Sequence, residues 1–504
     1  MPRRADLKTG YTCNSNCVFC VIGDKLFTGD RPTGELVEEL KLSRKTCEDV
    51  TFTGAEVTLR PDFLYLVGVA KKLGYRVIQV QTNGRLFAYR AFCEKTIAAG
   101  ANEFGPSLHS AEPKVHDGLT RSQGSFEQIT TAIRHLKALG QRIVTNTVAA
   151  KQNMRGLPDL ARLFVELKVD QFQIAFPHPT GHAATYFNAV VPKISELAPY
   201  VQEAMRIGEA AGIACMAEAM PYCQMKGYER FVSEIFIPPT EIVYDGFVVP
   251  DYKRDRMERG KTRFAQCASC RYEPMCEGPW RQYPEMVGDA EFQPVPGARV
   301  LDTLIVLDDR FELLGTPAPE LRLPSTAGGV ASLADFKSRW LAVAFYPEDG
   351  SPGCTTEACS LEAGRGGLRE AGIELVGVSP DPVERHEVFA RANGLGYPLL
   401  ADVKGEVAAA YRARVPGKGL RRSTYLLGPD RRIAHVLVQP DVGRHAAEIL
   451  DAVKRYEAPP RTLERGPELV IVRHAKPAAE AARELGLAEH DHHHFDSSSP
   501  VLPE

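Results

Sequence analysis

The sequence has few cysteines, almost no net charge and no long apolar run among its 504 residues. A formal net charge of −3 excludes the strong attraction that nucleic acids or anionic membranes exert on basic proteins, so we expect neither as a partner. No stretch approaches ~18 consecutive apolar residues, which excludes a membrane-spanning helix. The N-terminal residues are not followed by the apolar segment of a signal peptide, and we expect a cytoplasmic protein.

Twelve cysteines are too few to stabilise a chain of this length as a disulfide scaffold. Many of them are gathered in short runs, which indicates metal or redox chemistry in a reducing cytoplasm. The hydrophobic content of 44% and the charged content of 25% are ordinary for a globular protein. The length predicts roughly two to four domains with ample core.

The first cysteine run is Cys13-x3-Cys17-x2-Cys20, with Phe19 before the third cysteine. Three thiolates can hold three irons of a 4Fe–4S cluster and leave the fourth iron open to a cofactor. The alternatives are a redox pair or a zinc loop, although zinc sites usually join Cys-x2-Cys pairs and close with four ligands. The run resembles the radical S-adenosylmethionine (radical SAM) superfamily, in which the amino and carboxylate groups of SAM chelate the open iron.

Between residue 6 and about residue 179, strand-like segments alternate with amphipathic helical segments. Six such units predict an α/β fold with a parallel sheet and helices outside it. The resemblance implies the partial (βα)6 barrel of the radical SAM core, and barrel sites lie at the carboxyl ends of strands, where the cysteine run is expected. The expected strands are 7–12, 49–53, 76–82, 103–108, 142–148 and 171–176, and the expected helices include 63–73, 90–99, 125–139 and 157–167.

Small and polar residues also follow the later strands. Gly54-Ala55-Glu56-Val57 resembles the family's Gly-Gly-Glu-Pro turn, whose backbone and acid bind the SAM amino group. An ammonium group needs acceptors, and small residues let the backbone approach it. Taken singly, the other polar residues are equally typical of turns or helix starts. By resemblance, the predicted SAM-binding residues are Gly54, Glu56, Thr82, Asn83, Ser107, His109 and Asn146, whereas His178 and His182 either reach the pocket or are solvated.

A second cysteine run, C-x2-C-x5-C, lies at residues 267–276. It resembles the auxiliary-cluster region, called SPASM or twitch, of radical SAM enzymes that modify peptides or cofactors. The resemblance implies one auxiliary 4Fe–4S cluster, but a structural zinc site with the same residues stays open because spacing alone does not separate the two metals. The predicted ligands are Cys223, Cys267, Cys270 and Cys276, with Cys215 as an alternative to Cys223.

A third motif, FYPEDGSPGCTTEAC, occupies residues 345–359. It closely resembles the Q-type (bacterioferritin-comigratory) peroxiredoxins, which have a thioredoxin-like fold. Their nucleophile has to form a thiolate at neutral pH against a free-thiol pKa of about 8.5, and a helix N-terminus and a guanidinium both favour the anion. The resemblance implies Cys354 as nucleophile, Arg422 as the guanidinium, Ser351 as a hydrogen-bond partner, Pro347 as a shield and Cys359 as the resolving thiol.

These motifs predict a fusion of two enzymes. A radical SAM enzyme would cleave SAM to a 5′-deoxyadenosyl radical that modifies a peptide or small-molecule substrate, with a flavodoxin or ferredoxin-like electron donor. A thiol peroxidase would reduce hydroperoxides with a thioredoxin-like reductant. The expected parts are the radical SAM core at 1–215, the auxiliary segment at 216–296, a linker at 297–312, the peroxiredoxin at 313–457 and a flexible His-containing tail at 458–504.

Two alternatives come from other classes of function. The first is a peroxidase whose radical SAM half is a degenerate, SAM-binding regulatory module. The departure of Ala55 and Val57 from the family turn is its only support. The second is a non-catalytic Fe–S sensor coupled to a thiol switch.

Overall fold

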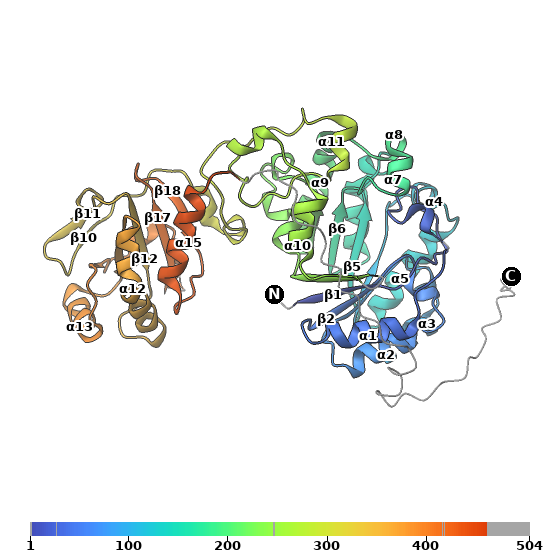
Figure 1. Ribbon diagram of the computed structural model, residues 1–504, viewed down its shortest axis with the longest axis horizontal. Coiled ribbons are helices and arrows are strands. Elements are labelled where there is room, and N and C mark those ends of the chain that lie inside the picture. The colour runs from blue at the N-terminus through green and yellow to red at the C-terminus, as the bar shows by residue number, and fades with distance from the viewer. Residues whose placement is uncertain (1–2, 27, 245–246, 416, 418, 461–504) are drawn as a thin grey trace. The chain divides into compact units, whose positions relative to one another are not determined.

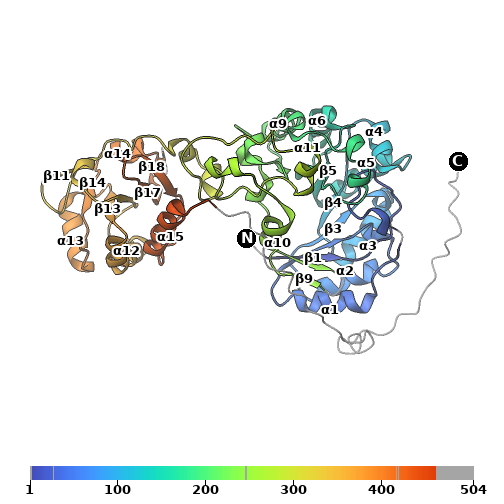
Figure 2. The same cartoon turned by 45° about the horizontal axis from the view of Figure 1, so that its top comes forward.

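The computed structural model describes residues 3–26, 28–244, 247–415, 417 and 419–460. These residues form two compact units, which are described separately below. The first unit contains residues 3–263 and 277–291, and the second contains residues 264–276 and 292–460. Figures 1 and 2 show the elements of each unit. The predicted His-containing tail lies outside the described residues from residue 461 onward.

The first unit is built on one sheet, in which the described strands follow the order β7-β6-β5-β4-β3-β2-β1-β8-β9. Strands β1 to β7 run parallel in sequence order, β8 pairs parallel with β1, and β9 returns antiparallel to β8. The strands are β1 (Arg4–Lys8), β2 (Asp49–Thr53), β3 (Ile78–Thr82), β4 (Glu103–Pro106), β5 (Arg142–Val148), β6 (Gln171–Ala175), β7 (Ala214–Glu218), β8 (Thr240–Tyr244) and β9 (Phe247–Val249).

Helices fill the crossovers between these strands. Right-handed crossovers that all advance in one direction place their helices on one face of the sheet. Figure 1 shows α1, α2 and α3 along the same side of the strands. The helices are α1 (Thr33–Ser43), α2 (Phe63–Lys72), α3 (Arg90–Ala99), α4 (Pro113–Thr120), α5 (Ser125–Ala138), α6 (Leu157–Glu166), α7 (His182–Thr185), α8 (Phe187–Val190), α9 (Ile194–Ala210), α10 (Tyr252–Asp255) and α11 (Gln282–Val287).

The two faces of this sheet differ in chemistry, because successive strand residues point to opposite sides. One face is apolar and buried, with residues such as Leu7, Phe52 and Phe104. The other face carries polar side chains in register across neighbouring strands. On it the Thr51 hydroxyl donates to Gln79 at 2.8 Å, and the Gln79 amide donates to Glu103 at 2.8 Å. This polar face is where an ionic ligand finds hydrogen-bonding groups.

The first strand differs from the prediction, whereas the other five lie within two residues of it. Strand β1 ends at Lys8, because the residues after it pair with another segment. The Arg31 N–H donates to the Thr9 carbonyl at 3.1 Å, and the Tyr11 N–H donates to the Gly29 carbonyl at 3.1 Å. The parallel sheet with outer helices is therefore confirmed, and the chain from Thr9 to Cys20 forms a loop at its carboxyl edge.

The second unit contains a mixed five-stranded sheet in the order β14-β13-β12-β17-β18. Its central strand β12 is buried along its whole length. This is the thioredoxin-like arrangement that the third motif predicts. The elements are β10 (Arg322–Pro324), β11 (Val330–Ser332), β12 (Trp340–Phe345), α12 (Pro352–Glu370), β13 (Ile373–Ser379), α13 (Val383–Asn393), β14 (Leu399–Ala401), α14 (Glu406–Ala410), β15 (Arg414–Val415), β16 (Gly419–Leu420), β17 (Ser423–Leu427), β18 (Ile433–Leu437) and α15 (His445–Glu457).

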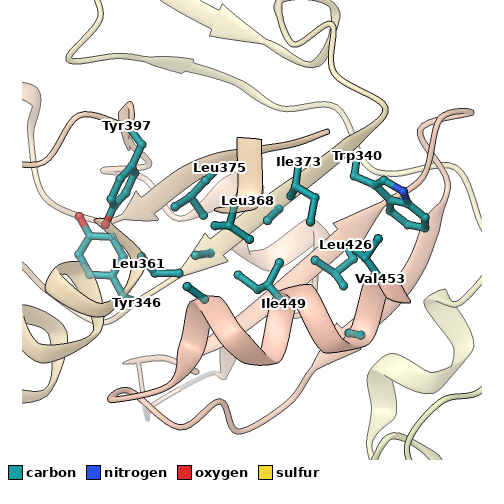
Figure 3. Close-up of a cluster of buried hydrophobic side chains, with 14 of the residues drawn as sticks. Trp340, Tyr346, Leu361, Leu368, Ile373, Leu375, Tyr397, Leu426, Ile449 and Val453 are labelled. Carbon is teal, nitrogen blue, oxygen red and sulfur yellow. The ribbon is translucent and has the colours of Figure 1, made fainter. Parts of the chain in front are cut away.

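The core of the second unit lies between helices α12 and α15 and one face of this sheet. Figure 3 shows Ile449 and Val453 of α15 packed against Leu426, with Trp340 at one end of the cluster. Tyr346 and Tyr397 lie together at the other end, next to the start of α12. The core therefore fixes the first turn of α12, where Cys354 lies.

The segment expected as a linker, 297–312, belongs to this second unit. It buries Val300 and Ile305, and it contains the short helical turns Leu304–Leu307 and Asp309–Leu313. No helix in the described ranges is long and apolar enough to cross a membrane.

Candidate functional site

The loop after β1 carries Cys13, Cys17 and Cys20, which are half-buried and not in disulfides. Other elements hold its backbone from several sides. The Val18 N–H donates to the Leu119 carbonyl at 2.9 Å, and the His182 ring donates through Nδ1 to the Cys17 carbonyl at 3.0 Å. The anchored loop therefore presents its three thiols together at the carboxyl edge of the sheet.

Burial raises the pKa of the Cys13 thiol to about 11, and burial followed by the neighbouring Cys20 and Cys13 thiols raises the pKa of Cys17 as well. Such sulfurs become thiolates only when positive charge or N–H donors stabilise them. One donor is present, because the Ser15 N–H points to Cys13 Sγ at 3.4 Å. Within the described residues, no three His, Cys, Asp or Glu side chains are arranged to hold a single metal ion. A cubane differs because each cysteine binds a separate iron.

The turn after β2 lies against this loop. The Ala55 N–H donates to the Gly10 carbonyl at 3.0 Å, and the Glu56 N–H donates to the Thr12 carbonyl at 2.9 Å. Gly54 has φ +136°, and a Cβ there would lie 2.8 Å from the Gly10 carbonyl oxygen, so only glycine fits. Ala55 has no positive φ, which explains why alanine is tolerated where the family turn has its second glycine.

The Glu56 carboxylate joins the turn to the end of β3. It is 2% exposed and accepts hydrogen bonds from the Thr82 hydroxyl at 2.7 Å and the Asn83 N–H at 2.6 Å. It also accepts from the Thr58 N–H at 3.2 Å. Burial raises the pKa of Glu56, whereas these donors lower it. The Asn83 amide donates to Asn14 Oδ1 at 2.6 Å, so Glu56, Thr82 and Asn83 all meet the cysteine loop.

The remaining predicted SAM-binding residues separate into two groups. Ser107 and Asn146 are bridge partners on the polar face, and Asn146 Oδ1 is buried with no hydrogen-bond partner among the described residues. His109 is buried beneath the cysteine loop, with its ring 4.8 Å from Phe19, and accepts from the Val148 N–H at 3.2 Å. Burial and then the neighbouring His116 hold its pKa well below the usual value. His109 therefore packs under the loop as a neutral ring.

A buried ionic cluster was missed by the sequence analysis. The Arg256 guanidinium, 2% exposed, contacts Glu277 at 3.0 Å, Glu218 at 3.2 Å and Glu234 at 3.5 Å. Glu218 ends β7, so the cluster lies at the same carboxyl edge as the cysteine loop. The contributing residues come from four separate segments, and no spacing in the sequence joins them.

Next to this cluster lie three buried polar atoms that have no hydrogen-bond partner among the described residues. The Lys261 ammonium lies 3.8 Å from the ring centre of Trp280, and the His178 ring stacks on Trp280 at 3.9 Å. Lys261 Nζ, Trp280 Nε1 and His178 Nε2 are buried and have no hydrogen-bond partner among the described residues. Burial and the nearby Arg256 lower the pKa of Lys261 to about 8. Native proteins rarely leave such groups unpaired, so this cluster is a candidate ligand site.

The second cysteine run carries N–H donors aimed at its sulfurs. The Phe264 N–H points to Cys267 Sγ at 3.5 Å, and the Val295 N–H points to Cys270 Sγ at 3.4 Å. Cys276 is half-buried in the same unit, and Cys223 belongs to the first unit. Cys215 is buried in β7 and donates to the Met205 carbonyl at 3.5 Å.

The second unit places a thiol beside a guanidinium. Cys354, 2% exposed, lies in the first turn of α12, and Arg422 Nη2 donates to its sulfur at 3.1 Å. Arg422 also pairs with the buried Glu357 carboxylate. A cavity of about 10 Å³, lined by Tyr346 and other residues, adjoins Cys354, which is room for about one water molecule.

The other predicted peroxiredoxin residues lie around this thiol. Ser351 precedes α12 and accepts the Thr355 N–H at 2.9 Å through its carbonyl, whereas Pro347 is exposed. Cys359 is exposed on α12, 3.9 Å from Asn393 Oδ1. The helix is unbroken between Cys354 and Cys359, so the two thiols point to different sides of it.

Comparisons with known proteins identify a family for part of each unit. A model of the radical SAM superfamily matches residues 7–164, and a model of the AhpC/TSA family matches residues 314–436. Peroxiredoxin Bcp of Bacillus subtilis is 34% identical over 148 residues, which is 28% of this chain and 94% of that protein. Residues 7–164 therefore form a radical SAM domain, and through its second unit the chain belongs to the Bcp-type peroxiredoxins.

Two further similar proteins are a curated relative and a solved structure. Peroxiredoxin Bcp of Escherichia coli is 31% identical over 149 residues, which is 28% of this chain and 96% of that protein. A solved structure of peroxiredoxin Q from Xanthomonas campestris is 33% identical and covers 27% of this chain and 89% of that chain, with a TM-score of 0.26.

Membership in the radical SAM superfamily implies a 4Fe–4S cluster and SAM. The residues of the first unit fit both groups. Three half-buried thiols extend from one loop, and the Ser15 N–H points to Cys13 Sγ. The orphaned Asn146 Oδ1 is an acceptor on the polar face that a polar ligand would satisfy.

Arg422→Ala tests the contact with Cys354. Removing the cation makes deprotonation of the thiol harder, so the pH profile of Cys354 alkylation by iodoacetamide should move to higher pH. Near neutral pH the alkylation rate should fall about tenfold, since hydrogen bonds to charged groups contribute ~1.5–3 kcal/mol. Arg421→Ala is the matched control, because Arg421 contacts Asp309 at 3.0 Å and not the thiol. An unchanged profile in Arg422→Ala would show that the guanidinium does not stabilise the thiolate.

Proposed function

We propose that the chain is a bifunctional enzyme that cleaves SAM in its first unit and reduces hydroperoxides in its second. The observation that carries the first activity is the meeting of the cysteine loop with the Glu56 turn at the carboxyl edge of the parallel sheet. This is the edge at which sites of such sheets form. The contact between Cys354 and Arg422 at 3.1 Å carries the second activity.

In the first unit, Cys13, Cys17 and Cys20 would hold a 4Fe–4S cluster. When bound with SAM, the cluster supplies the electron that splits SAM into methionine and a 5′-deoxyadenosyl radical. Glu56 fixes the turn through its hydrogen bonds to Thr82 and Asn83. Among the residues that the structure describes, its Oε2 atom accepts the Asn83 N–H alone, so it retains capacity for an ammonium donor.

The substrate would bind at the cluster of Lys261, Trp280 and His178. Lys261 Nζ and Trp280 Nε1 are hydrogen-bond donors with no acceptor in the described part of the chain, which favours a substrate with a carboxylate or carbonyl oxygen. Both a peptide and a small cofactor precursor carry such groups. The position beside Glu218, at the end of β7, supports a role at the same edge as SAM.

Cys17→Ala tests the SAM-cleaving site. Loss of one thiolate should remove about four irons per chain and abolish 5′-deoxyadenosine formation after anaerobic reconstitution and dithionite reduction. Cys47→Ala and Cys93→Ala are matched controls, because both residues are buried outside the loop. Wild-type cleavage in Cys17→Ala would refute the assignment, and a chain that never cleaves SAM would favour the regulatory-module alternative.

The second cysteine run would hold an auxiliary 4Fe–4S cluster through Cys267, Cys270 and Cys276, with Cys223 as the fourth ligand. Backbone N–H donors to Cys267 and Cys270 support this, since they stabilise thiolate sulfurs and tune iron–sulfur sites. The buried position of Cys215 in β7 disfavours it as a ligand.

The combined variant Cys13/Cys17/Cys20→Ala isolates this auxiliary site. It should still bind about four irons per chain, because a second cubane needs only its own thiolates. Cys223→Ser in that background should lower the iron content, whereas Cys215→Ser should not. Recovery of zinc instead, after anaerobic expression with iron supplied, would favour a structural zinc site.

In the second unit, the Cys354 thiolate would attack the peroxide. A sulfur–oxygen bond forms and the O–O bond breaks, so Cys354 becomes a sulfenic acid. The departing oxygen takes up the proton that the Cys354 thiol had released and leaves as an alcohol or, from hydrogen peroxide, as water. The Cys359 thiol then condenses with it, a disulfide forms and water leaves. A thioredoxin-like reductant would reduce that disulfide by thiol exchange. For the first unit, a flavodoxin or ferredoxin-like protein would supply the electron for SAM cleavage.

Cys354→Ser and Cys359→Ser separate these steps. Cys354→Ser should abolish peroxide consumption and leave anaerobic SAM cleavage intact. Cys359→Ser should keep the first turnover, slow recycling with thioredoxin and promote over-oxidation of Cys354, all measurable by peroxide assay and intact mass. If Cys354→Ser still consumed peroxide, the second unit would be only a thioredoxin-like scaffold.

A further inference from the structure

The second unit contains a buried histidine in contact with the Arg422–Glu357 pair. His445 begins α15, is 0% exposed and lies beyond residues 314–436, the part that the AhpC/TSA model matches. Its Nδ1 atom is 3.0 Å from Glu357 Oε1, and its Nε2 atom is 2.8 Å from the Thr424 hydroxyl. Three elements distant in sequence therefore converge on one imidazole.

These contacts continue to the reactive thiol. The other oxygen of Glu357, Oε2, pairs with Arg422 Nη1, and Arg422 Nη2 donates to Cys354 Sγ at 3.1 Å. Glu357 is 3% exposed, so water does not replace a lost partner. The orientation of the guanidinium beneath the sulfur thus depends on a carboxylate that His445 also holds.

The protonation state of His445 follows from its surroundings. Burial lowers the pKa of His445 to about 4, with Glu448 of its own helix opposing this and Arg422 adding to it. The ring is therefore neutral near neutral pH. In the tautomer whose Nε2 accepts from the Thr424 hydroxyl, the ring proton lies on Nδ1, and Nδ1 is 3.0 Å from Glu357 Oε1.

We propose that His445 is a positioning residue that fixes Glu357, and through it holds Arg422 against Cys354. The proposal rests on the peroxidase function proposed above. Without the ring, the buried Glu357 Oε1 would lose the Nδ1–H group that lies 3.0 Å from it. Glu357 would then turn both oxygens towards Arg422, because buried carboxylates need donors, and bidentate pairing with a guanidinium supplies them. That movement draws the guanidinium away from the sulfur.

The test is the pH profile of Cys354 alkylation by iodoacetamide in full-length His445→Leu. The profile should move to higher pH, and the second-order rate with hydrogen peroxide should fall about tenfold near neutral pH. His445→Asn should recover most of the rate, because its amide N–H lies near the Nδ1 position. His445→Gln should recover less, since its amide lies near Nε2. Thr424→Val removes only the contact between the Thr424 hydroxyl and His445 Nε2, and it should shift the alkylation profile slightly to higher pH.

His435→Leu is the matched control. His435 lies in β18 of the same unit, is 2% exposed and also has its pKa lowered to about 4 by burial, but it does not contact Glu357. It should change the unfolding temperature without moving the alkylation profile. An unshifted profile in His445→Leu, or an equal shift in His435→Leu, would overturn the proposal. If His445→Leu does not fold, a wild-type profile in both His445→Gln and Thr424→Val would overturn it.

Alkylation does not require peroxide turnover. The alkylation profile therefore tests the effect of His445 on Cys354 even if Cys354→Ser still consumes peroxide and the second unit is no peroxidase. A shift without peroxidase activity would refute the proposed function and keep the positioning role of His445.

Discussion

Burial keeps a cysteine thiol protonated, and every proposed reaction of this chain depends on overcoming that effect. In the loop after β1, burial raises the pKa of Cys13 and Cys17, so these sulfurs need an external cation such as iron. In the second unit the cation is built into the protein as Arg422, 3.1 Å from Cys354. One chain would therefore stabilise thiolates in two ways, by a bound metal cluster and by a guanidinium that the fold holds in place.

The parallel register of the first sheet decides where its chemistry can occur. All carboxyl ends of β1 to β7 meet at one edge, which brings the cysteine loop, the Glu56 turn and Asn83 together although they lie far apart in sequence. The same edge receives Glu218 and, from later segments, Arg256 and Lys261. A polar inner face and an apolar outer face follow from strand alternation, so binding groups and core residues are separated within each strand.

The sequence offers candidate residues where the chemistry is local. The Cys13–Cys20 spacing, the turn at Glu56 and the motif ending in Cys359 each lie within one short segment, and Arg422, predicted through the family pattern, lies 3.1 Å from Cys354. Strand β1 was misplaced because Thr9 and Tyr11 pair with residues 29–31, a contact that alternation of side chains does not encode.

Residues whose role depends on distant partners were missed. Lys261 and Trp280 meet through tertiary packing, and no local pattern distinguishes either from a surface lysine or a core tryptophan. His445 is similar, because only the fold brings it to Glu357. Burial of these polar groups, rather than their spacing, is the signal that identifies them.

The position of Glu357 connects the positioning contact to the later disulfide step. Cys354 and Cys359 are separated by about 7.5 Å along the helix axis, beyond the reach of a disulfide, so the start of α12 would have to unwind for the proposed disulfide to form. The N-terminus of α12 lacks one stabilising interaction, because the Ser351 side chain makes no capping hydrogen bond. Glu357 lies between the two cysteines, and unwinding therefore pulls it away from Arg422 and His445. The contacts that stabilise the thiolate oppose disulfide formation, and loss of the thiolate by oxidation removes one partner of that network. The Cys354 thiolate would thus need the first turn of α12 intact, whereas the disulfide with Cys359 would need that turn unwound.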